Sequence, residues 1–141
     1  EFAAKHKAVV MTHSGQERSK PEDYLEFTDE CPEMTLIVAH LGCRYDSDPY
    51  HQVYAVQRSA HGNVYLDTSS ASNVTPRLLE TAVEMIGTDR MLYGSDVACY
   101  FSPMQRARVD SAFISDEDKK KILYKNAMKL FPKIPYIEEE N

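Results

Sequence analysis

The stretch TLIVAHLG (residues 35–42) places a continuous run of branched apolar residues directly before a histidine. Similar runs occur at residues 8–12 (AVVMT), 63–67 (NVYLD) and 90–93 (RMLY). Runs that are apolar throughout, rather than alternating with polar residues, are typical of strands buried on both faces of a parallel sheet. The sequence therefore predicts four parallel strands, one at each run.

Segments with a helical pattern of apolar residues separate these runs. They cover residues 21–31, 49–60 and 76–86, and a last helix is expected over 116–131. We expect Thr75 to cap the third helix, with Pro76 at its first position and Gly87 ending it. Strands and helices that alternate every 27 residues or so predict an α/β fold built from βα units.

Composition limits what the chain can be. Its 141 residues suit one domain over 1–141, with a frayed tail at 132–141, and 43% of them are apolar. The net charge of −6 argues against nucleic-acid or anionic-membrane partners, because both need a basic surface. No apolar run approaches the roughly 18 residues that a membrane span needs. The three cysteines include no CxxC pair, which favours a cytoplasmic location.

Polar residues follow each predicted strand. His13 follows the first, His40 the second, Asp67 the third and Asp96 the fourth. The carboxyl ends of parallel strands converge on the face where ligands bind. Imidazole and carboxylate are ligands of zinc, and also of manganese or iron. A single histidine after a strand is commonly a loop or core residue, but repetition in successive βα units favours a metal or catalytic site.

Five stretches carry a family resemblance: MTHSG (11–15), LIVAHLG (36–42), NVYLDTS (63–69), RMLYGSD (90–96) and KILYKNAMKLF (121–131). Together they resemble the second half of an amidohydrolase-superfamily barrel. The most similar branch contains the aminocarboxymuconate-semialdehyde decarboxylases, resorcylate decarboxylases and dicarboxylate lactonases. The resemblance implies that this chain supplies strands five to eight of a TIM (β/α)8 barrel, with outer helices.

The resemblance also implies roles for three residues. His13 matches a metal-binding histidine, and Asp96 matches an aspartate that is both a metal ligand and a base for the attacking water. His40 matches a histidine that positions or activates water or substrate in mononuclear members and binds a second metal in dinuclear ones. The expected cofactor is one divalent cation, with zinc preferred and manganese possible.

The sequence departs from the family pattern at the first metal ligands, because these 141 residues contain no His-x-His pair. A complete barrel needs about 250 residues, so the chain fits half of one. Open strand edges invite pairing. We therefore expect the chain to associate, either as a homo-oligomer or with the other half of a barrel.

The implied substrate is a small carboxylated molecule. Arg44 lies just past His40 and is a candidate for a bidentate contact with its carboxylate, and Ser69 is a second candidate for substrate binding. We expect a metal-dependent hydrolase or non-oxidative decarboxylase that uses a metal-activated water or a metal-bound substrate. Two alternatives stay open: a non-catalytic half barrel that needs a partner, and a structural metal-binding domain that also uses Cys43 and Cys99.

Overall fold

The computed structural model describes residues 1–70 and 75–132 of the chain. Within these residues, four parallel strands form one sheet in chain order: β1 (Val9–Thr12), β2 (Thr35–Val38), β3 (Val64–Asp67) and β4 (Met91–Leu92). Neighbours in the sequence are neighbours in the sheet because intervening helical segments return the chain to the start of the next strand. The predicted parallel α/β fold is confirmed.

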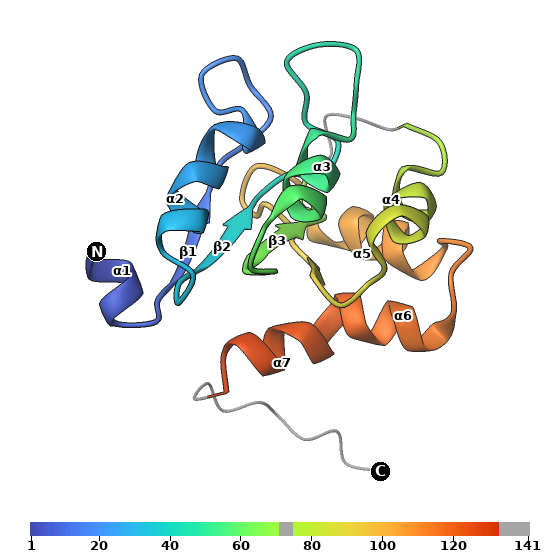
Figure 1. The fold of residues 1–141 in the computed structure, drawn as a ribbon. Helices are drawn as coiled ribbons and strands as arrows, with labels where there is room; N and C mark the ends of the chain where they lie inside the picture. The colour runs from blue at the N-terminus through green and yellow to red at the C-terminus, as the bar shows by residue number, and fades with distance from the viewer. Residues whose placement is uncertain (71–74, 133–141) are drawn as a thin grey trace.

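Helices occupy the segments between and beyond the strands (Figure 1). They are α1 (Phe2–Lys5), the 3-10 turn η1 (Pro21–Tyr24), α2 (Leu25–Glu30), α3 (His51–Arg58), α4 (Leu78–Ile86), α5 (Ser102–Asp110), α6 (Asp116–Lys120), the π-helical turn η2 (Lys121–Lys125) and α7 (Asn126–Leu130). Figure 1 shows α1 and α2 beside β1, with α4, α5 and α6 at the other end of the strand order, beyond β3.

The apolar runs form the core, as their continuous pattern predicts. Val38 of β2, Leu66 of β3 and Met91 of β4 are fully buried, and Val53 and Val56 of α3 pack in the same cluster. The β1 strand is less buried than β2, β3 and β4. The core therefore fixes β2, β3 and β4, and the carboxyl ends of these strands, with the segments that follow them, carry His40, Asp67 and Asp96 of the predicted site.

Two helix predictions were wrong in detail. The α4 helix begins at Leu78 rather than Pro76, after Arg77 in a left-handed conformation (φ 56°), and it has no side-chain cap. Gly87 ends this helix as predicted, at φ 67°. Helix α5 is an element that the apolar pattern did not predict, since only Gln105 and Val109 of its residues are buried.

The last helical segment is attached to the sheet by a buried asparagine. The side-chain amide of Asn126 donates to the carbonyl oxygens of Thr88 (2.7 Å) and Met91 (2.9 Å). Ser115 caps the start of α6 by accepting from the backbone N–H of Asp118. The predicted frayed tail at 132–141 lies outside the described residues apart from Pro132. Among the helices of the described ranges, none has the length and apolar content needed to cross a bilayer.

Candidate functional site

A pocket of about 350 Å³ opens at the carboxyl ends of the strands. All the strand-end positions singled out in the sequence contribute to it, together with a few neighbours: Met11, His13, Ala39, His40, Asp67, Ser69, Gly94, Ser95 and Asp96. Its walls come from segments separated by more than 80 positions in the chain. The parallel topology therefore assembles the pocket, as the strand-end pattern predicts.

The structure brings His13, His40 and Asp96 together. The imidazole rings of His13 and His40 meet edge to face, with their centroids 4.9 Å apart. The His40 Nδ1 lies 3.9 Å from the Asp96 Oδ2, and the two side chains are 16% and 29% exposed. The His13 residue is exposed. The site is thus a partly open group of two imidazoles and one carboxylate, accessible to a small molecule.

His40 and Asp96 both have a left-handed backbone, at φ 75° and φ 51°. Residues with a Cβ atom seldom adopt this conformation, and it is found repeatedly at functional sites. Hydrogen bonds hold each turn: the His40 N–H donates to the Asp67 Oδ1 (2.9 Å), and the Asp96 carbonyl accepts from the N–H groups of Cys99 and Tyr100. The fold therefore maintains these two residues in an unusual conformation at the pocket.

Asp67 is buried beneath His40 and organises the centre of the pocket. Its Oδ1 atom accepts the backbone N–H of Ser69 (2.9 Å) in addition to that of His40, and it also accepts the Ser69 hydroxyl at 2.5 Å. The Ser69 Oγ lies 2.7 Å from the His40 Nδ1. Sequence reasoning placed Asp67 and Ser69 at the pocket but did not predict that they contact His40.

Two glycines near the strand ends leave room for neighbouring segments. A Cβ atom on Gly94 would lie 2.8 Å from the Ser69 Cβ and 3.0 Å from the Asp67 Cγ, too close for either. A Cβ atom on Gly15, which has φ 95°, would lie 2.2 Å from the Cys43 carbonyl oxygen. The glycine beside the His or Asp in these strand-end motifs thus leaves room for the neighbouring loop.

The remaining predicted residues lie outside the pocket lining. Arg44 is exposed, and its guanidinium donates to the carbonyl of Ser47 at 3.2 Å. The Cys43 thiol contacts the Gly15 carbonyl at 3.7 Å, and Cys99 is exposed. Neither cysteine therefore joins the His and Asp group, and the role of Arg44 in substrate binding stays a prediction.

The donor chemistry fits a divalent cation as part of a larger ligand set. The imidazole of His13 and the carboxylate of Asp96 are ordinary ligands for zinc or manganese. Over residues 1–70 and 75–132, no group of three or more His, Cys, Asp or Glu side chains is arranged to hold a metal ion. In this chain, His13 and Asp96 are thus two candidate ligands rather than a complete cage.

Comparison with solved structures identifies the architecture. An uncharacterized TIM-barrel protein from Bordetella bronchiseptica superposes with a TM-score of 0.73 at 19% identity, covering 93% of this chain and 48% of that one. A 2,6-dihydroxybenzoate decarboxylase from Rhizobium gives a TM-score of 0.57 at 21% identity, covering 74% of this chain and 36% of that one. The chain spans less than half the length of either barrel, which confirms the prediction of about four βα units from a TIM barrel.

A third structure contains a metal ion. A dihydroxybenzoic acid decarboxylase from Polaromonas, with bound manganese and the inhibitor 2-nitroresorcinol, has a TM-score of 0.60 at 22% identity, covering 82% of this chain and 40% of that one. The comparison with curated proteins gives no match. A model of the family described as amidohydrolase matches residues 1–133, nearly the whole chain. With that match over a sheet whose strand ends carry His13, His40 and Asp96, this chain belongs to the amidohydrolase family.

Proposed function

We propose that this chain forms part of the active site of a metal-dependent hydrolase or non-oxidative decarboxylase acting on a small carboxylated substrate. One observation carries the proposal: His13, His40 and Asp96 line one pocket at the carboxyl ends of a parallel sheet in an amidohydrolase chain. Two structurally similar proteins are decarboxylases of dihydroxybenzoates, and this supports a carboxylated aromatic as the substrate class.

His13 and Asp96 would hold a divalent cation together with ligands from outside this chain. When bound, such a cation supplies Lewis acidity that polarises a carbonyl or acidifies water. The sequence favours zinc, whereas the similar Polaromonas enzyme holds manganese, so both ions belong in the test. The Asp96 carboxylate is the proposed proton acceptor at the pocket, and His40 beside it acts on water or substrate.

We also propose that the open edge of β1 is covered by association with further barrel strands. A second copy of the chain would supply them when the chain is expressed alone. A groove of about 350 Å³ beside this edge, lined by Val10, Tyr24, Phe27, Met34 and other residues, supports the proposal. The cysteine pattern supports a cytoplasmic location.

The experiment combines metal binding with turnover. The chain, with the strands that complete its barrel, is titrated with manganese and zinc and assayed for loss of 2,6-dihydroxybenzoate. We expect Asp96→Ala to abolish turnover and to weaken metal binding by about 100-fold or more. Mutating a residue that only hydrogen-bonds to a metal ligand typically lowers metal affinity by about 10–100-fold, and losing a ligand should cost at least as much. Asp110→Ala is the matched control, because Asp110 is an exposed acid that pairs with Arg106 on α5.

The outcomes separate the enzyme from its alternative. If the assembled protein contains no stoichiometric metal and its activity is unchanged by EDTA, a metal-dependent reaction is excluded. Metal binding without turnover of any carboxylated aromatic or ester probe would favour the non-catalytic half barrel.

A further inference from the structure

The Ser69 hydroxyl contacts two side chains of the pocket. Its oxygen lies 2.5 Å from the Asp67 Oδ1 and 2.7 Å from the His40 Nδ1. Ser69 and Asp67 are both buried, so water does not compete freely for these contacts. A hydroxyl has one proton and can donate only one of the two hydrogen bonds, which means that it must accept the other.

The surroundings of Asp67 decide the direction of these bonds. Its Oδ1 already accepts the backbone N–H groups of His40 and Ser69, both at 2.9 Å. An oxygen that accepts two N–H groups acts as an acceptor towards the hydroxyl as well. The Ser69 proton therefore lies towards Asp67, and the Ser69 oxygen accepts from the His40 ring.

A second group supports the same direction. The Asp96 Oδ2 lies 3.9 Å from the same His40 Nδ1. A carboxylate favours the positive end of an N–H dipole over a nitrogen lone pair, so it stabilises a proton on Nδ1. The two neighbours of Nδ1, a hydroxyl oxygen and a carboxylate, both act as acceptors.

We propose that Asp67 and Ser69 are positioning residues that hold neutral His40 in the tautomer with its proton on Nδ1. The Nε2 atom then carries a lone pair. The tautomer itself follows from the contacts, and only its role in a reaction rests on the proposed function. In that reaction, neutral His40 would accept a proton or bind a cation through Nε2, and it would not donate a proton from Nε2. The order Asp67, Ser69, His40 resembles that of a carboxylate orienting a base, with the hydroxyl as the connecting group.

The test reads the tautomer directly. The chain, assembled with the strands that complete its barrel and freed of metal with EDTA, is labelled with ¹⁵N-histidine. Two-bond ¹H–¹⁵N correlations of the rings are recorded at a pH of about 9, where an ordinary imidazole is neutral. The His40 signals are assigned by their loss in His40→Gln. We expect the Nδ1–H pattern in the parent chain. Ser69→Ala should convert it to a mixture of tautomers, whereas Ser95→Ala, which removes another pocket hydroxyl, should leave it unchanged.

The parent spectrum alone is sufficient to decide, even if Ser69→Ala fails to fold. A dominant Nε2–H pattern in the parent would overturn the proposal. The His40 Nδ1 would then be an acceptor, and the Ser69 hydroxyl would donate to it rather than to Asp67. An unchanged His40 pattern in a folded Ser69→Ala chain would also overturn it. Neither readout depends on metal or turnover, so a failure of the proposed function and a failure of this inference are distinguishable.

Discussion

His13 and His40 differ in their surroundings although both follow a strand. The His40 ring is mostly buried, and its Nδ1 faces a hydroxyl and a carboxylate. His13 is exposed and contacts the pocket group through the edge of its ring. The several contacts of His40 hold its ring in one position, as expected for a group that acts on a bound substrate. The exposed imidazole of His13 is accessible to a cation that arrives from solvent, as expected for a metal ligand.

If the proposed function holds, His40→Ala and His13→Ala should separate metal binding from turnover in the assembled protein. The His40→Ala protein should keep its metal, and its kcat should fall by roughly 10²–10⁴-fold, which is the usual contribution of an acid–base group. His13→Ala should lose metal and turnover together, with partial recovery when metal is added. Metal stoichiometry is measured alongside kcat for both variants.

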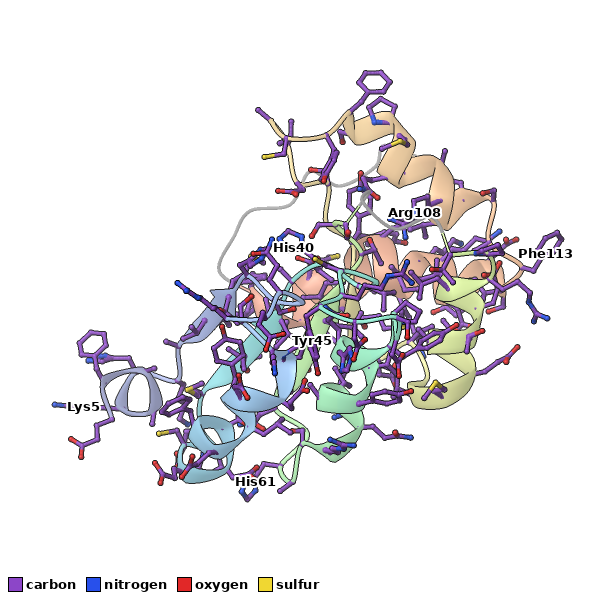
Figure 2. All side chains as sticks on the ribbon, turned by 90° about the horizontal axis from the view of Figure 1, so that it is seen from above. Lys5, His40, Tyr45, His61, Arg108 and Phe113 are labelled. Atoms are coloured by element: carbon purple, nitrogen blue, oxygen red, sulfur yellow. The ribbon has the colours of Figure 1, made fainter. Side chains whose placement is uncertain are left out.

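His61→Ala provides the matched control for these variants. His61 is exposed, and Figure 2 shows it at the lower margin of the molecule, well away from His40. A metal-free His40→Ala protein would show that His40 is itself a metal ligand. A variant that binds a single ion where the parent binds two would mean that the site is dinuclear.

The sequence was sufficient to predict that His13, His40 and Asp96 lie close together. The carboxyl ends of parallel strands share one edge of the sheet, and this follows from the backbone topology alone. The sequence could not predict the hydrogen bond between Ser69 and His40, which are 29 positions apart and meet only through their side-chain orientations. Arg44 shows the same limit, since a long flexible side chain can turn towards its own loop rather than the pocket.

The helices depend on contacts that their own sequences do not fully reveal. Helix α5 carries few apolar residues, yet it is attached to the pocket wall because the Gln105 amide donates to the Ser69 carbonyl at 2.7 Å. Arg108 from the same helix donates to the carbonyl of Ser70. Burial lowers the pKa of the Arg108 guanidinium. Periodicity alone misses a helix held by polar contacts, and the start of α4 was misplaced because a left-handed Arg77 precedes it.

The attachment of the last helical segment gives a prediction at this scale. Asn126→Ala should lower the free energy of unfolding by about 1–3 kcal/mol, because the Thr88 and Met91 carbonyls lose a buried donor. Met128→Ala on the same helix is the control, since Met128 is 40% exposed and its truncation should change stability less. Urea unfolding at a fixed protein concentration measures both, and equal stability of the two variants would contradict this role of Asn126.

At the scale of the whole molecule, the sheet formed by residues 1–70 and 75–132 has an open edge at β1. Phe27 on α2 is 60% exposed and lines the groove beside this edge, and Met11 of β1 is 62% exposed. Exposed apolar surface next to an unpaired strand is typical of an interface. This chain covers only 36% and 48% of the two similar structures, so a closed barrel requires strands beyond the four described here.

We therefore expect the chain, expressed alone, to be oligomeric or to aggregate, and Phe27→Lys to reduce this association by placing a charge in the groove. Phe113→Lys makes the same exchange at a residue that is 91% exposed, between α5 and α6. Figure 2 shows Phe113 on the side of the molecule opposite Lys5 of α1, so this variant should associate like the parent. Light scattering across a concentration series measures the mass, and a thermal melt reports folding. A monodisperse parent monomer that melts cooperatively would show that the β1 edge needs no partner, while equal effects of the two variants would locate the interface elsewhere.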